Sequence, residues 1–425
     1  MKYLLILSLL LSLAEAAAQF SRDSIYSDFV LYQRRTDFDQ YLRNNTIQKT
    51  FSSGFDKNQE DYYREACWTI SQFLLDNTTI QQGMDMLLEH YQELQYDTKR
   101  ALLEAIYGVY PQRFSNRIAT LIQTETQQKL FAMQAAYLFR QNPGQWQEYI
   151  RRQTSTLVQQ TGTTSPLLEE LLKWMDNYQQ PISTPPLADL FTQQHQLGKK
   201  MIYSLQRQDR DQPGLAIVQD ADGHFVRDEN GHLQVFAQLA RSASNLPYFI
   251  TNGSTPQGLF SIQGTAVSNN KFIGPTPNIQ LVMPFENDSV YWHGRYDSSR
   301  TALDNYRQLL PESWQRYAPI TEVLYAGKIG RTEIIAHGTT IDPDYFTDKP
   351  YYPLTPTMGC LCAREIWNIF SGRINQSDQL QLANSMISSK GDDGWLIVVN
   401  IDNQHKPVSR EEIEKIVDDW EKSRR

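Results

Sequence analysis

The sequence predicts an α+β protein of more than one domain, in which an all-α N-terminal domain precedes a β-rich domain with helical insertions. Apolar residues recur at helical spacing through residues 26–178. A proline-rich stretch at 179–186 then interrupts this pattern. Beyond residue 214 the apolar period changes to two, and Asp-Gly and Asn-Gly pairs mark turns. We therefore expect an export signal, a helical domain, a linker with a connecting helix, and a β-rich domain at residues 1–18, 19–180, 181–212 and 213–425.

The N-terminal segment has the composition of an export signal. Lys2 precedes a largely apolar run at 3–13, and small residues at 14–18 contain an Ala-x-Ala cleavage pattern. The run is too short to span a bilayer, so a retained anchor is the weaker alternative. We expect the mature chain to be exported and to have no integral membrane span.

Composition restricts the partners and the chemistry. The chain of 425 residues has a formal net charge of −8 and no Lys/Arg stripe, which argues against a nucleic-acid partner. Cys67 lies at helical spacing with apolar residues and is expected to be a buried thiol. Cys360 and Cys362 are too close together for an unstrained disulfide. The histidines lack metal-ligand spacing, so neither a metal nor a cofactor is predicted.

The helical domain consists of short amphipathic helices joined by short turns. Apolar residues at i, i+3, i+4 and i+7 form a stripe at 84–91, and similar stripes occur at 102–110, 131–139 and 168–175. A loose period of roughly thirty residues would suit a HEAT-like solenoid, and an irregular bundle fits the same pattern. The expected role is structural or protein-binding, with a partner in the cell envelope.

The C-terminal half mixes strands and helices. The expected strands lie at 215–218, 233–237, 248–251, 258–262, 279–284, 290–293, 333–336 and 395–400. The expected helices lie at 187–207, 300–317, 366–369, 379–387 and at the C-terminus. Ser409 and Glu412 form a capping box that predicts the start of this last helix.

The residues with the clearest chemical potential lie between 334 and 362. His337 is followed by Gly338, and Gly359 directly precedes Cys360. A thiol needs a base to become a nucleophile at neutral pH, and imidazole suits that task. A glycine before the nucleophile permits a sharp turn that can direct main-chain N–H groups toward a developing oxyanion. These residues therefore predict a cysteine–histidine catalytic pair.

Four ordered motifs link this pair to a known family. They are TPQGLFSI at 255–262, LVMPF at 281–285, HGT at 337–339 and TMGCL at 357–361. In this order they resemble the L,D-transpeptidase (YkuD-type) catalytic domain of bacterial cell-wall enzymes. The resemblance covers residues 215–407 and leaves the helical domain unassigned. It implies a β-rich sandwich or barrel in which cysteine and histidine meet on adjacent strands.

The resemblance also implies a reaction and a location. Cys360 matches the nucleophile and His337 the base, while the Gly338 carbonyl would orient the imidazole. The Gly359 and Cys360 N–H groups would form the oxyanion hole. The thiolate would attack a peptidoglycan stem peptide, expel a D-amino acid and leave a thioester, which an amine resolves. The protein would then be periplasmic or associated with the cell envelope, with stem peptides as partners.

Two alternatives remain open. If water resolves the thioester, the protein is an L,D-carboxypeptidase or endopeptidase on the same fold. The family turn carries a second histidine where this chain has Met358, and Arg or Asn where it has Cys362. These departures allow a third interpretation, an envelope interaction module with impaired catalysis. The loop after His337 resembles a substrate-facing lid. The candidate substrate-binding residues are Thr357, Met358, Arg364, Tyr351, Tyr352 and His293.

Overall fold

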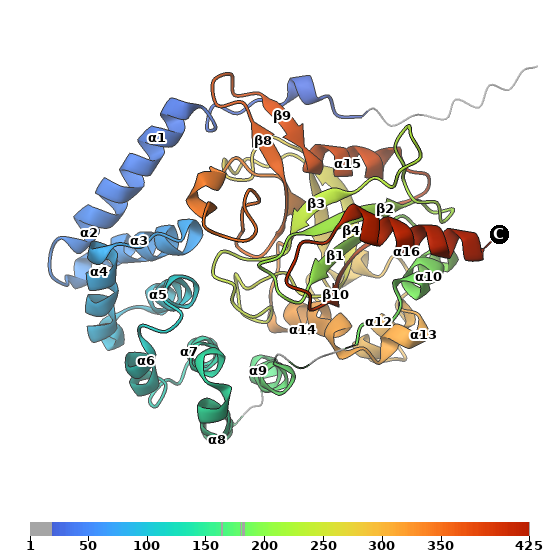
Figure 1. Cartoon of the computed structure of the whole chain (residues 1–425). Helices are drawn as coiled ribbons and strands as arrows, with labels where there is room; N and C mark the ends of the chain where they lie inside the picture. Colours follow the sequence, from blue (N-terminus) through green and yellow to red (C-terminus); the bar gives the residue numbers. More distant parts are fainter. Residues whose placement is uncertain (1–18, 163–164, 179, 181–182, 425) are drawn as a thin grey trace, which may run out of the picture.

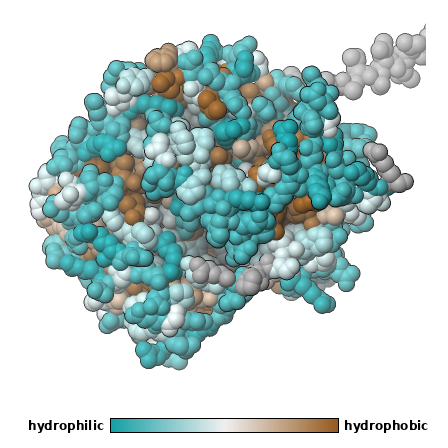
Figure 2. All heavy atoms as spheres, in the orientation of Figure 1, coloured by the Kyte–Doolittle hydropathy of each residue, from teal (hydrophilic) through white to brown (hydrophobic). Residues whose placement is uncertain are grey.

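The computed structural model describes residues 19–162, 165–178, 180 and 183–424, so the predicted export signal lies outside the described residues. The predicted α+β class is confirmed. A helical N-terminal region curves around one side of a closed eight-stranded barrel (Figure 1). The face shown in Figure 2 is mostly hydrophilic, with scattered hydrophobic patches. Within the described residues, no helix combines the length and the apolar character needed to cross a membrane.

The N-terminal region, which we call the helical array, is a succession of short helices. Alternate helices contact one another, since α3 packs on α5, α5 on α7 and α7 on α9. Asn77 caps α4 by accepting a hydrogen bond from the Ile80 N–H, and Ser165 caps α9 in the same manner. The helices are α1 (Tyr32–Tyr41), α2 (Lys49–Phe51), α3 (Glu60–Phe73), α4 (Thr78–Glu89), α5 (Tyr96–Val109), α6 (Ser115–Leu121), α7 (Gln128–Gln141), α8 (Pro143–Thr161) and α9 (Pro166–Asn177).

The barrel has the strand order β1-β10-β4-β5-β6-β7-β3-β2 and closes between β2 and β1. The pairs β1–β10 and β6–β7 are parallel, and the other neighbours are antiparallel. Its strands are β1 (Met201–Arg207), β2 (Gly214–Gln219), β3 (Phe236–Leu239), β4 (Gly258–Ala266), β5 (Asn278–Val282), β6 (Ala336–His337), β7 (Leu361–Ala363) and β10 (Trp395–Asp402).

Helices and one hairpin surround the barrel. The hairpin consists of β8 (Glu365–Trp367) and β9 (Ile374–Ser377). The helices are α10 (Leu187–Leu197), α11 (Asp288–Tyr291), α12 (Ala302–Gln308), α13 (Glu312–Gln315), α14 (Glu322–Ile329), α15 (Asp378–Ser388) and α16 (Arg410–Ser423). The predicted cap is confirmed, because Ser409 Oγ accepts a hydrogen bond from the Glu412 N–H at the start of α16. The strand predicted at 395–400 and the helix predicted at 379–387 are also confirmed.

Several local predictions were wrong. The helix expected at 187–207 ends at Leu197, and β1 follows as a fully buried strand between β2 and β10. A strand buried on both faces has no polar alternation, so its sequence is not distinguished from a buried helix. The segment 248–251 forms a turn, 290–293 includes the end of α11, and 366–369 begins in β8. Each is a short apolar run, for which periodicity carries little information.

The helical array and the barrel share one hydrophobic core. Barrel-side residues Leu246, Phe249, Phe346 and Tyr351 belong to the same buried cluster as the helices of the array. Three polar contacts fix the loop 245–257, since Glu104 accepts from Asn252 Nδ2 (3.0 Å), Lys129 donates to Thr251 (2.9 Å) and the Tyr248 hydroxyl donates to Glu170 (2.6 Å). The array therefore supports a barrel loop that contains part of the TPQGLFSI motif.

Candidate active site

The predicted histidine and cysteine lie on two neighbouring parallel strands. His337 ends β6, and Cys360 directly precedes β7. In the register, His337 is opposite Cys362, and the Leu361 N–H donates to the Ile335 carbonyl (3.0 Å). Cys360 Sγ lies 3.6 Å from the Glu333 carbonyl oxygen. Pairing of β6 with β7 thus brings the cysteine turn to the segment that leads into the histidine.

His337 is buried and held as a neutral base. Its Nδ1 hydrogen-bonds to the Gly338 carbonyl, which can only accept, so Nδ1 carries the proton and the Nε2 lone pair is left for a substrate or a thiol. Burial lowers the pKa of His337 to about 4, although the Gly338 contact acts in the opposite direction. A Cβ atom at Gly338 would lie 2.2 Å from the Glu365 carboxyl carbon, so a side chain here would displace the buried carboxylate that accepts from the Thr339 N–H (2.9 Å).

Thr357 closes the turn that carries Cys360. Its Oγ1 accepts from the Gly359 N–H (3.0 Å) and donates to the Cys360 carbonyl (2.8 Å). Gly359 has φ +118°, in the region that favours glycine, and its carbonyl accepts from Thr255 Oγ1 (3.0 Å). The Gly359 amide, which the sequence predicted as an oxyanion donor, is therefore engaged within the turn. Within the described part of the chain, the Cys360 amide has no hydrogen-bond partner.

Arg331 is the main feature that sequence reasoning missed. Its side chain is buried and donates to the carbonyls of Gly253 (2.9 Å), Ser254 (3.0 Å) and Tyr248. A Cβ atom at Gly359 would lie 2.5 Å from Arg331 Nη2, so the guanidinium packs directly behind the cysteine turn. No carboxylate pairs with it among the residues that the structure describes.

The charge of Arg331 acts on the thiol. Burial lowers the pKa of Arg331 to about 10, so the guanidinium stays charged at neutral pH. Burial raises the pKa of the Cys360 thiol, while the Ile335 N–H and the Arg331 charge lower it. The resting cysteine is thus a thiol, and the imidazole on the neighbouring strand is neutral. No hydrogen bond joins Cys360 to His337 among the described residues.

The two other cysteines lie in the core. Cys362 is buried, with the Thr355 hydroxyl 3.6 Å from its sulfur, and burial raises the pKa of Cys362 to about 12. Cys67 is fully buried within α3, and burial raises its pKa as well. Both thiols are free. Of the three, only Cys360 is partly exposed and faces a cation.

The structure separates some predicted substrate-binding residues from the cysteine turn. Arg364 pairs with Asp378 at the start of α15 (3.2 Å). His293 hydrogen-bonds to Ser261 Oγ (2.8 Å) and the Gly394 carbonyl (3.0 Å), which indicates a structural role at strand β4. Of the predicted lid residues, Tyr351 is buried and Tyr352 is exposed, while Met358 is half-buried within the cysteine turn itself.

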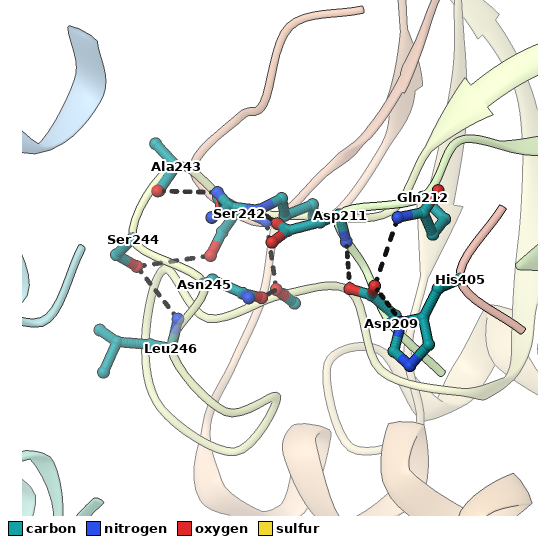
Figure 3. Close-up of polar contacts among 11 residues, drawn as sticks. Asp209, Asp211, Gln212, Ser242, Ala243, Ser244, Asn245, Leu246 and His405 are labelled. Carbon is teal, nitrogen blue, oxygen red and sulfur yellow. Dashed lines mark hydrogen bonds and ion pairs between the residues drawn. The ribbon is translucent and has the colours of Figure 1, made fainter. Parts of the chain in front are cut away.

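Arg241 orders the segment 241–246, which supports the cysteine turn. It donates to Asp211, to the Ser242 carbonyl (2.7 Å) and to the Ala243 carbonyl (2.9 Å). The Ala243 N–H in turn donates to the Thr357 carbonyl (2.7 Å). Figure 3 shows this segment folded back on itself beside the Asp209–His405 pair. The Arg241 guanidinium also lies 5.0 Å from the centre of the Tyr351 ring. Tyr351 therefore anchors the lid loop and does not face solvent.

Comparisons with known proteins provide no relative. No family model matches the chain, and no curated protein or solved structure is similar to it. In the described ranges, no cluster of three or more His, Cys, Asp or Glu side chains is arranged to hold a metal ion.

Proposed function

We propose that this protein is an exported cysteine-dependent acyltransferase of the L,D-transpeptidase type that acts on peptidoglycan stem peptides. One observation carries the proposal. A partly exposed cysteine directly precedes the strand that pairs with the histidine strand, and behind it lies an arginine that has no carboxylate partner within the described residues. The Gly338 carbonyl fixes the histidine tautomer. The four ordered motifs and the N-terminal export signal support the substrate class.

The proposed reaction has two steps. The Cys360 proton passes to His337 Nε2 as the sulfur attacks the amide carbonyl of a donor stem peptide, and the Cys360 N–H donates to the developing oxyanion. The C–N bond breaks, the departing D-amino acid takes the proton from His337, and a thioester remains. An amine of a second stem peptide then gives a proton to His337 and attacks the thioester, the C–S bond breaks, and the Cys360 sulfur takes the proton back from His337. Substrate binding must bring the thiol and the imidazole into hydrogen-bond contact.

Mass spectrometry of the intact protein tests this proposal. Incubation with a muropeptide or a carbapenem is expected to add one acyl group to the wild type and to the Cys362→Ala variant. The Cys360→Ala variant is expected to remain unmodified. An identical adduct on Cys360→Ala would refute the nucleophile. Muropeptide product analysis then separates transfer from hydrolysis, since crosslinked dimers require an amine acceptor and tripeptide products alone indicate water.

A second function is favoured by two features of the cysteine turn that do not suit catalysis. The Gly359 amide is engaged by Thr357, and burial raises the pKa of the Cys360 thiol. A domain fixed in this state would serve as an envelope interaction module without turnover. Alkylation of Cys360 by iodoacetamide distinguishes the two functions, because an impaired site predicts slow alkylation and a near-normal thiol pKa. Fast alkylation at neutral pH supports the enzyme.

A further inference from the structure

A cavity of about 830 Å³ lies between the helical array and the barrel. Helices α7 and α9 form one wall, and the other wall includes the loop 245–257 and the segment 315–325. Neither Cys360 nor His337 lines the cavity. Thr255, whose hydroxyl donates to the Gly359 carbonyl, does line it, so the cavity adjoins the cysteine turn but does not contain the candidate catalytic pair. Its volume falls within the range of about 300–1,000 Å³ that is usual for small-molecule sites.

The acidic side chains of this cavity already have partners within the protein. Glu170 pairs with Lys173 (2.5 Å), Asp209 contacts His405 (2.9 Å), and Asp402 pairs with the buried Arg207 (2.7 Å). The remaining acid, Glu322, accepts hydrogen bonds from the backbone and side-chain N–H groups of Gln257 (2.8 and 3.2 Å). Burial raises the pKa of Glu322 to about 7, which reduces its negative charge at neutral pH.

The arginines of the same cavity are less completely paired. No ion pair to a carboxylate is formed by any of the four that line it within the described residues, namely Arg140, Arg210, Arg307 and Arg316. Arg140 donates to the Tyr107 carbonyl (2.9 Å) and lies 3.8 Å from the centre of the Tyr107 ring. Arg210 donates to the Thr255 carbonyl (3.3 Å), and Glu322 is the acid whose charge acts on it without forming an ion pair. Arg210 Nη1 and Arg307 Nε are buried without a hydrogen-bond partner in the structure as described.

These groups define the ligand that the cavity would accept. Guanidinium groups bind carboxylates and phosphates through paired, charge-assisted hydrogen bonds, and a buried donor without an acceptor is costly. Aromatic side chains, including Trp174, Tyr178 and Tyr325, add flat apolar surface to the lining. We infer that this cavity is a second binding site, which takes a small anionic ligand bearing several carboxylates or a phosphate through Arg140, Arg210, Arg307 and Arg316. This inference does not depend on the proposed acyl transfer.

Calorimetric titration of the exported chain with defined anions tests the site. The probes are propane-1,2,3-tricarboxylate, inorganic phosphate and the uncharged triamide of the first probe. We expect one molecule of an anion to bind per chain, more weakly at higher salt, and the triamide not to bind. Tighter binding of the tricarboxylate would identify carboxylates as the natural groups, and tighter binding of phosphate would identify phosphate esters.

Arginine variants locate the binding. The double variant Arg140→Gln/Arg307→Gln should weaken anion binding by at least about tenfold. The control Arg300→Gln alters an arginine outside the cavity lining, which pairs with Asp297 (3.1 Å), and should leave the affinity unchanged. Should the double variant fail to fold, Arg316→Gln, whose side chain is exposed, should still weaken binding severalfold.

Three outcomes would overturn the inference. These are no binding of either anion, equal binding of the triamide, and equal losses in the cavity variants and in Arg300→Gln. The Cys360→Ala variant separates this site from the proposed acyl-transfer site. It should bind the anions like the wild type even though it forms no acyl adduct. Loss of anion binding in Cys360→Ala would place the probe at the cysteine turn and contradict a second site.

Discussion

Two buried arginines occupy opposite electrostatic situations in this barrel. Arg207, at the end of β1, is fully buried and pairs with both Asp402 (2.7 Å) and Glu412 (2.6 Å). Arg331, behind the cysteine turn, is also buried, but within the described residues it donates only to main-chain carbonyls. A cation neutralised by two carboxylates helps to hold the folded chain together, and its charge has little effect on other groups. A cation held only by carbonyl dipoles keeps its charge available for an anion.

The difference separates a structural region from a chemical one. The Arg207 contacts connect β1 with the end of β10 and with α16. The Arg331 contacts leave the nearby Cys360 as the group whose ionised form gains most from the guanidinium. We therefore expect changes around Arg207 to affect folding and changes around Arg331 to affect thiol chemistry.

The largest effect should come from removing the thiol. Cys360→Ser is expected to lower acyl transfer by at least about a thousandfold, because the nucleophile and its base act as a unit. The melting temperature should change little, because Cys360 is partly exposed. Turnover of labelled muropeptide and a thermal melt measure the two quantities. A large drop in melting temperature would show that the turn is structural, like the Arg207 region.

Arg207→Met should have the largest effect on folding. Loss of the guanidinium leaves Asp402 and Glu412 without their cation, and we expect the free energy of unfolding to fall by about 3–5 kcal/mol. Urea denaturation measures the change. The rate of Cys360 alkylation in the folded protein should stay the same. A matched control is Arg300→Met, which removes an exposed i,i+3 pair and should cost less than about 1 kcal/mol.

The free energy of unfolding should depend on pH through Glu104, which supports the loop 245–257 whose carbonyls accept from Arg331. This buried carboxyl accepts from Asn252, whose neighbour Gly253 accepts from Arg331, and burial raises the pKa of Glu104 to about 7. The folded state therefore binds the proton more tightly than the unfolded state. The contribution of Glu104 to stability is complete below its unfolded pKa of about 4.5 and is lost as the pH rises through 7.

A variant isolates this contribution. Between pH 5 and pH 8, Glu104→Gln should reduce the loss of stability by about 2 kcal/mol relative to the wild type. Urea denaturation at the two pH values measures the difference. Glu89→Gln, an exposed change in α4, is the control and should follow the wild-type pH dependence. Parallel pH profiles for Glu104→Gln and the wild type would contradict the role of Glu104.

The smallest effect concerns thiol reactivity. Arg331→Gln is expected to raise the pKa of Cys360 by about one unit and to slow its alkylation at neutral pH about tenfold. Arg331→Lys, which keeps the charge, should restore most of the rate. The pH–rate profile of iodoacetamide alkylation reports this value, and circular dichroism checks the fold. Identical profiles for the Gln and Lys variants would show that Arg331 acts only by packing, as a structural arginine does.

Sequence periodicity predicted the parts of the fold whose environment changes from one face to the other. The amphipathic helices of the array and α16 with its Ser409 cap have this pattern. Strand β1 lacks it, because both of its faces are buried, and was predicted as a helix. In the candidate site, the sequence indicated His337 and Cys360 from their motifs. Arg331 belongs to no motif, and its role depends on carbonyls of the loop 248–254 that only the tertiary fold supplies.

The common core of the helical array and the barrel has a consequence for dissecting this protein. The prolines at 181, 185 and 186 suggest a natural place to cut the chain into modules. Leu246, Phe249 and Phe346 nevertheless pack into the same core as the array, so either half alone would expose apolar surface to water. A chain nicked between α9 and α10 should therefore remain a tight complex of two fragments, whereas the barrel expressed without its partner should aggregate.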